Sequence, residues 1–216
     1  MARCVLLRIR WTEDEKMPCE VRRFGDMSSF RLEREVIPIS GRLKNTYYIV
    51  GLPGIGKSGI LKILSEDFGY PTVDFDELVE IESGKKPWQI IRDNGLNYYK
   101  VVERKVLKRI SNIRGYIVTV GSVENVGDFI EEYKKKGRVL YLKTSYRGFL
   151  ERWLRRVQRF KMKEKPNRKD VKRMYNTFQD VINGKTDFVI FIDNKSQFEI
   201  ARIIDDYVKS TEKGKR

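Results

Sequence analysis

The residue pattern best suited to chemistry in this chain is a glycine-rich loop. It reads G-x-x-x-x-G-K-S over residues 51–58, the spacing of loops that cradle phosphates. Backbone N–H groups of such a loop, together with the N-terminus of a following helix, form an anion site. In this arrangement Lys57 reaches the β- and γ-phosphates, and the hydroxyl of Ser58 holds Mg²⁺. The residues predicted to bind ATP are Gly51, Gly54, Ile55, Gly56, Lys57, Ser58 and Gly59.

The segments on either side of the loop decide between this interpretation and an ordinary glycine turn. An apolar run at 47–50 precedes the loop, and residues 60–64 are apolar at helical spacing. A strand, a glycine loop and a helix in this order are the context that the phosphate-binding motif requires. The flanks therefore favour a nucleoside triphosphate site.

Two carboxylates, Asp74 and Asp76, follow the next apolar run. Alternation along a strand places both on one side, at the ligand crevice of an open α/β sheet. We expect Asp74 to lie near Mg²⁺ and its waters, and Asp76 to orient or deprotonate an acceptor hydroxyl. The structural alternative is that Asp76 only caps the following helix. The chain has no histidine, which phosphoryl transfer tolerates because it depends mainly on positioning and electrostatics.

An arginine-rich segment suggests a closing lid. Four arginines lie at i, i+3, i+4 and i+7, on one face of a predicted helix: Arg152, Arg155, Arg156 and Arg159. Such arginines neutralise charge that develops on transferred phosphates, so we predict a lid at about 152–172, with Arg155 and Arg159 as catalytic residues. A solvated basic face is the alternative.

The elements that must position these residues alternate between strands and helices. Strands are predicted at 47–50, 73–76, 116–120, 139–142 and 188–192. Helices are predicted at 57–67, 76–82, 87–91, 96–110, 126–136, 146–160, 170–183 and 196–209. Short apolar strands between helices are typical of a parallel sheet covered on both faces. The predicted fold is an α/β three-layer sandwich of the P-loop NTPase class, spanning residues 45–212.

Residues 1–44 precede this pattern and are predicted to form a small β appendage. Strand-like runs occupy 4–11, 21–24 and 30–39. Basic residues interleave with aromatic ones there, a pattern that fits either single-stranded nucleic acid binding or packing onto the core. Cys4 and Cys19 are too few, without histidine, for a four-ligand zinc site. They are either free thiols or a disulfide.

Composition limits the partners. The net charge is +15. The segment from Lys143 to Arg173 contains thirteen Lys or Arg residues and only three acidic ones. This concentration of positive charge implies polyanionic partners. Nucleotide phosphates are the first candidates, and nucleic acid is the alternative. No apolar run approaches the roughly 20 residues of a membrane span, and the N-terminal apolar stretch is too short for a signal peptide. We therefore expect a cytoplasmic protein without a membrane partner; its oligomeric state is open.

Beyond the loop, several segments resemble shikimate kinases, which belong with the nucleoside-monophosphate kinases to one group of P-loop kinases. Residues 68–80 are similar to the family segment that carries its D-x-D motif. Gly84 and the pair at 90–91 match its G-x-x-I-x-x-I run. The pattern G-E-x-x-F-R-x-x-E is matched by Gly95, Tyr99, Lys100 and Glu103. Gly121 and Ser122 stand where the family has a glycine-rich triplet, and the likeness covers about residues 47–208.

The resemblance implies an ATP- and Mg²⁺-dependent phosphotransferase that acts on a hydroxyl group of a small acceptor. It assigns acceptor binding to Asp76, Lys100, Gly121, Ser122 and Arg173, the last of these only by an approximate match. Lys100 replaces an arginine of the family, and a lysine is a point charge that cannot make the bidentate fork to a carboxylate. The identity of the acceptor therefore stays open.

Two other functions compete with this interpretation. In the first, the acceptor is a nucleotide or an RNA end, and the basic lid and the N-terminal segment hold its phosphates. In the second, the chain is a non-catalytic nucleotide-binding module. The carboxylate pair of Asp74 and Asp76 argues against the second, because a binder does not need it.

Overall fold

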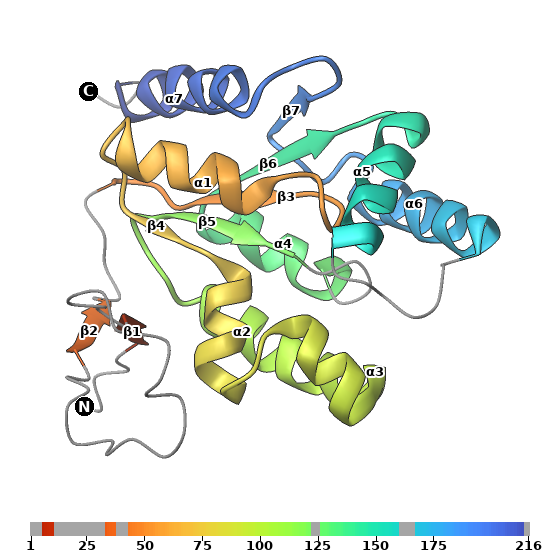
Figure 1. Cartoon of the computed structure of the whole chain (residues 1–216). Coiled ribbons are helices and arrows are strands. Elements are labelled where there is room, and N and C mark those ends of the chain that lie inside the picture. Colours follow the sequence, from red (N-terminus) through yellow and green to blue (C-terminus); the bar gives the residue numbers. More distant parts are fainter. Residues whose placement is uncertain (1–5, 11–32, 38–42, 122–125, 160–166, 214–216) are drawn as a thin grey trace, which may run out of the picture. The chain divides into compact units, whose positions relative to one another are not determined.

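The computed structural model describes residues 6–10, 33–37, 43–121, 126–159 and 167–213 (Figure 1). The chain divides into two compact units, residues 1–39 and 40–216. In the first unit, β1 (Leu6–Arg10) pairs antiparallel with β2 (Glu33–Ile37), with Leu6 opposite Ile37. Both strands fall within predicted ones. The predicted strand at 21–24 and both cysteines lie outside the described residues.

The second unit is built on a sheet of five parallel strands, which confirms the predicted α/β class. In spatial order the strands are β4 (Thr72–Val73), β5 (Ile117–Val120), β3 (Tyr47–Val50), β6 (Arg138–Lys143) and β7 (Phe188–Phe191). β3 and β5 are buried along their whole length. Strands covered on both faces read as continuous apolar runs, which is why the sequence pattern located them.

Helices cover both faces of this sheet (Figure 1). They are α1 (Lys57–Glu66), α2 (Phe75–Ser83), α3 (Pro87–Ile110), α4 (Val126–Lys136), α5 (Tyr146–Arg159), α6 (Arg168–Ile182) and α7 (Gln197–Lys213). α1 packs against α7 on one face. On the other face α4 packs against β6, and α3 and α6 both contact α4. No helix in the described ranges is long and apolar enough to cross a membrane.

α3 joins two helices that the sequence pattern separated. Gly95 interrupts it with φ 83° and ψ 166°, a conformation outside the helical region that glycine adopts readily. The predicted helices at 87–91 and 96–110 correspond to the two arms on either side of this residue. The break gives the two arms different directions.

Gly137, between α4 and β6, sits against the backbone of the neighbouring strand. A β-carbon there would overlap the carbonyl oxygen of Thr46 and lie 2.9 Å from its carbonyl carbon and 3.0 Å from the Tyr48 ring. We expect Gly137→Ala to lower the free energy of unfolding by about 2–3 kcal/mol, since a buried backbone cannot move aside cheaply. Urea denaturation measures this change. Gly127→Ala is the control, because its new methyl group meets only the movable side chain of Val181, and an equal loss in both variants would contradict the explanation.

Glu212, in the last turn of α7, ties that helix to the start of β3. Its carboxylate accepts hydrogen bonds from Lys44 N at 2.9 Å, Asn45 N at 3.1 Å and the Tyr47 hydroxyl at 2.8 Å. Burial alone would raise the pKa of Glu212, but these donors together hold it below its usual value.

A depressed pKa makes this contact sensitive to acid. The stabilisation by Glu212 is complete above the unfolded-state pKa of about 4.3 and disappears as the pH falls through the lower folded-state pKa. We therefore expect Glu212→Gln to lower the free energy of unfolding by about 2 kcal/mol at pH 7 and by clearly less at pH 3. Denaturation at the two pH values tests this. A difference that does not change with pH would contradict the assignment.

Candidate functional site

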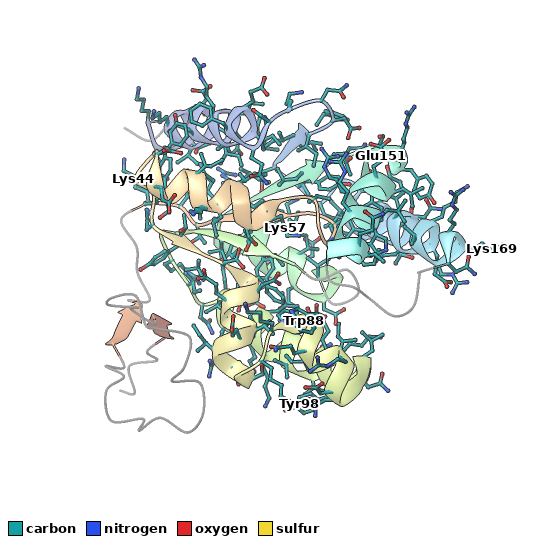
Figure 2. All side chains as sticks on the ribbon, viewed as in Figure 1. Lys44, Lys57, Trp88, Tyr98, Glu151 and Lys169 are labelled. Carbon is teal, nitrogen blue, oxygen red and sulfur yellow. The ribbon has the colours of Figure 1, made fainter. Side chains whose placement is uncertain are left out.

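A cavity of about 1170 Å³ lies at the carboxyl ends of the strands. Its lining comes from the glycine loop, α2, α3, α5, α6 and the start of α7. Figure 2 shows Lys57 at the start of α1 and Trp88 on α3, both of which line the cavity. This is the place where open α/β sheets bind ligands.

The glycine loop is folded around the Lys57 side chain. The Lys57 ammonium donates to the carbonyl oxygens of Gly51 at 2.7 Å and Leu52 at 3.0 Å, and the residue is only 9% exposed. Gly54 and Gly56 have φ of 79° and 102°, which disfavour any other residue. The loop thus holds a positive charge at the start of α1, where the backbone N–H groups also point.

Six of the seven residues predicted to bind ATP line the cavity: Gly54, Ile55, Gly56, Lys57, Ser58 and Gly59. Gly51 does not line it. Its carbonyl instead accepts the hydrogen bond that orients Lys57. A β-carbon at Gly51 would overlap the Ile55 side chain and lie 3.3 Å from the Leu142 carbonyl oxygen of β6, so packing favours glycine at this position.

Asp74 caps α2, and here the structure departs from one sequence expectation and from one alternative. β4 ends at Val73, because Asp74 Oδ1 accepts from the backbone N of Asp76 at 2.8 Å and so begins the helix. The predicted strand through residue 76 is therefore too long, and the cap is Asp74 rather than Asp76. The other oxygen, Oδ2, accepts from the Thr119 hydroxyl at 3.2 Å, and Asp74 is 8% exposed.

Asp76 lies in the first turn of α2 and lines the cavity. Gly121, at the end of β5, lies beside it. A β-carbon on Gly121 would be 3.7 Å from Asp76 Oδ1 and 3.0 Å from the Phe75 ring. The absence of a side chain at Gly121 keeps the space in front of the Asp76 carboxylate open to a ligand.

The donor set at the loop suits Mg²⁺. Ser58 offers a hydroxyl, and Asp74 and Asp76 offer carboxylates, all of them oxygen ligands of the kind that Mg²⁺ prefers. Among the described residues, no group of three or more His, Cys, Asp or Glu side chains is gathered for metal binding. Mg²⁺ characteristically keeps several waters and is held by one or two carboxylates together with substrate phosphates.

The opposite wall of the cavity is formed by α3. Lys100, predicted to bind the acceptor, lines it together with Tyr99 and Glu103, which is only 4% exposed. Apolar side chains complete this wall: Trp88, Ile91 and Leu96. Sequence reasoning did not single out Trp88, because its spacing on the helix resembles an ordinary core position.

Arg152 is fixed at the end of the sheet by neighbours that are remote in sequence. Its guanidinium contacts the Thr144 hydroxyl at 3.3 Å, the Ile192 carbonyl at 3.4 Å and the Asp193 carboxylate at 3.5 Å. Burial would raise the pKa of Asp193, but hydrogen bonds from Thr144 and Ser145 keep it low. The ionised Asp193 therefore holds Arg152 toward the cavity, which Arg152 lines.

The remaining predicted lid residues have different positions. Arg155 is exposed and lines the cavity. Arg159 ends α5, but its side chain lies outside the described part of the structure, as do Ser122 and residues 160–166 of the lid. Residues 152–159 belong to α5 and 168–172 to α6, so the described ends of the predicted lid are helical.

Arg173 is not part of the cavity wall. Its side chain is 80% exposed and pairs with Asp170 at 3.8 Å, one turn earlier on α6. Met174, the next residue, lines the cavity instead. The approximate motif match therefore selected a residue on the exposed side of α6, one position before the residue that lines the cavity.

Gln197 is a cavity residue that no sequence signal marked. Its side-chain amide, at the start of α7, lies over the glycine loop, with Nε2 2.9 Å from the place of a β-carbon on Gly56. It would also collide with a β-carbon on Gly59, at 2.6 Å. Only the packing of α7 on α1 brings this residue to the nucleotide loop.

Comparison with known proteins agrees with this geometry. A family model described as shikimate kinase matches residues 53–209. A shikimate kinase of Persephonella marina is 30% identical over 158 residues, which cover 73% of this chain and 94% of that protein. One of Sulfurihydrogenibium is 35% identical over 111 residues, covering 51% of this chain and 66% of that protein.

Solved structures show the same fold. Shikimate kinase from Acinetobacter baumannii, in complex with shikimate, superimposes with a TM-score of 0.66 at 22% identity, covering 79% of this chain and 96% of that one. The enzyme from Aquifex aeolicus gives 0.61 at 23% identity, covering 79% and 99%. The second unit of this chain therefore shares the fold of both.

Proposed function

Because this chain belongs to the shikimate kinase family, we propose that it transfers the γ-phosphate of ATP to a hydroxyl group of shikimate. As a member of that family it is an ATP-dependent phosphotransferase with an alcohol-group acceptor. The observation that carries the proposal is that the glycine loop and the pair of Asp76 and Gly121 line one cavity.

The loop supplies the donor side of the reaction. Its backbone N–H groups and the positive end of α1 receive the phosphates, and Lys57 places its charge against the β- and γ-phosphates. Since the lysine is already oriented by Gly51 and Leu52, little reorganisation is needed when charge develops. Arg152 and Arg155, on α5, add positive charge to the cavity wall.

Asp76 serves the acceptor. Its carboxylate accepts a hydrogen bond from the attacking hydroxyl and orients the oxygen toward the γ-phosphorus. It takes the proton as the new P–O bond forms and the bond to the β-phosphate oxygen breaks, which releases ADP. The open space at Gly121 admits the acceptor. Ser58 and, through water, Asp74 are the residues that would hold Mg²⁺. When bound, this ion neutralises charge on the phosphate oxygens.

The nucleotide or RNA alternative rested on the positive charge of the predicted lid and on the basic and aromatic residues of the N-terminal segment. The relatives described above are shikimate kinases, and none is named for a nucleic acid substrate. The basic segment between Lys143 and Arg173 is partly explained by Arg152 and Arg155, which line the cavity. A small hydroxyl compound is therefore the favoured acceptor.

A coupled assay of ADP release tests the proposal. We expect ADP release to depend on both Mg²⁺ and shikimate, to saturate with shikimate, and to remain at background with a short RNA. Release that shikimate does not stimulate would overturn the proposed acceptor.

A further inference from the structure

The acceptor side of the cavity contains two acidic residues, whose negative charge would repel an anionic acceptor. Asp76 and Glu103 both line it, and Glu103 is 4% exposed. A buried carboxylate needs a compensating charge, and Lys100, three residues before Glu103 on α3, is the cation one turn away. Two carboxylates on this side of the cavity disfavour a further anion nearby, so an anionic acceptor needs additional positive charge there.

Lys86 is the other cation on this side. It lines the cavity and sits at the N-cap of α3, immediately before Pro87. In the part of the chain that the structure describes, no acidic side chain forms an ion pair with the Lys86 ammonium. The positive end of the first arm of α3 adds to its field.

The backbone that carries Lys86 is fixed in place. A residue before proline is confined to extended conformations, and Lys86 has φ −67° and ψ 151°. Its backbone N donates to Gln89 Oε1 at 2.9 Å, and its carbonyl accepts from Ile90 N at 3.1 Å. The side chain therefore starts from a rigid point at the cavity wall.

The neighbouring lysine is directed elsewhere and provides a matched comparison. Lys85 binds Asp93 with its ammonium, at 3.1 Å, and does not line the cavity. The two lysines are adjacent and chemically identical, and they differ in that Lys85 pairs with Asp93, a carboxylate that it shares with Arg92 at 2.7 Å. Of these two lysines, Lys86 lines the cavity and has no acidic partner within the described ranges.

We propose that Lys86 is an acceptor-binding residue whose ammonium holds the carboxylate of the substrate. The inference rests on the proposed function, since it takes shikimate, a carboxylic acid, as the acceptor. A lysine acts as a point charge and needs no bidentate geometry. Lys86 thus supplies binding charge where the family's arginine is replaced by Lys100.

Calorimetric titrations with shikimate and with its uncharged methyl ester test the proposal. We expect Lys86→Met to weaken shikimate binding about tenfold and to leave ester binding within twofold of wild type. Lys86→Arg should retain shikimate affinity, and Lys85→Met should change neither ligand. In turnover assays the KM for shikimate should rise about tenfold, while the KM for ATP and kcat stay near wild type.

Two results would overturn the proposed role of Lys86 but not the proposed function of the protein. One is an unchanged shikimate affinity in Lys86→Met, and the other is an equal loss of affinity for the acid and the ester. In both cases the wild-type protein still phosphorylates shikimate, so the proposed function stands. A wild-type protein that neither binds nor phosphorylates shikimate would overturn the proposed function, and this inference with it.

Discussion

Replacing Asp76 by asparagine is expected to lower kcat by about 10²–10⁴-fold, the range typical for loss of a positioned general base. Asparagine keeps the size and the hydrogen-bonding oxygen but cannot take the proton of the acceptor hydroxyl. Asp76 does not cap α2, because Asp74 does, so the variant should fold normally. ATP affinity should change little, since the nucleotide loop is a separate segment of the cavity wall.

Steady-state kinetics and an ATP titration of the same preparation measure both effects. Glu77→Gln is the matched control, because Glu77 adjoins Asp76 in the first turn of α2 but does not line the cavity. It should retain wild-type kcat. Wild-type turnover in Asp76→Asn would contradict the proposed role of this carboxylate.

Replacing Lys57 by alanine is expected to reduce phosphotransfer by at least about 10³-fold, because the loop loses the charge that meets the transferring phosphate. The variant also loses the two hydrogen bonds to Gly51 and Leu52 that hold the loop in shape. ATP affinity should therefore fall as well, which distinguishes this variant from Asp76→Asn.

Lys62→Ala is the control for Lys57→Ala. Lys62 lies on the same helix, but it is exposed and pairs only loosely with Glu66, at 3.8 Å. Such surface pairs contribute little, so its kcat and KM should match wild type. If Lys57→Ala retained more than about a tenth of wild-type turnover, the donor-side mechanism would be wrong.

Much of the fold was predictable because its elements are separated by clear local signals. The strand at 47–50 and the helix at 126–136 were predicted with their observed limits. In the first case a continuous apolar run meets a glycine loop, and in the second a glycine follows the last periodic residue. The strand predicted at 73–76 was too long because an aspartate that caps a helix cannot be distinguished in sequence from one that ends a strand. The hydrogen bond from Asp76 N to Asp74 identifies Asp74 as the cap.

The candidate site was predictable only where its residues lie close together in the chain. The glycine loop and the two aspartates are local motifs, and the structure places them at one cavity. Gln197 and Asp193 reach the site only because α7 and β7 pack against distant elements, and neither carries a recognisable motif. Lys86 was missed for another reason, since a sequence cannot show that Asp93 pairs with Lys85 and Arg92 and not with Lys86.

The most direct test of the central claim is transfer of radiolabel from [γ-³²P]ATP, with shikimate, nucleoside monophosphates and short RNAs as competing acceptors. Unlike ADP release, label in a product identifies the acceptor and excludes simple hydrolysis. The proposed function predicts Mg²⁺-dependent label in phosphorylated shikimate, at least about 10²-fold less in Asp76→Asn, and none in RNA or nucleotides. Label in RNA or in a nucleoside monophosphate, with none in shikimate, would contradict it.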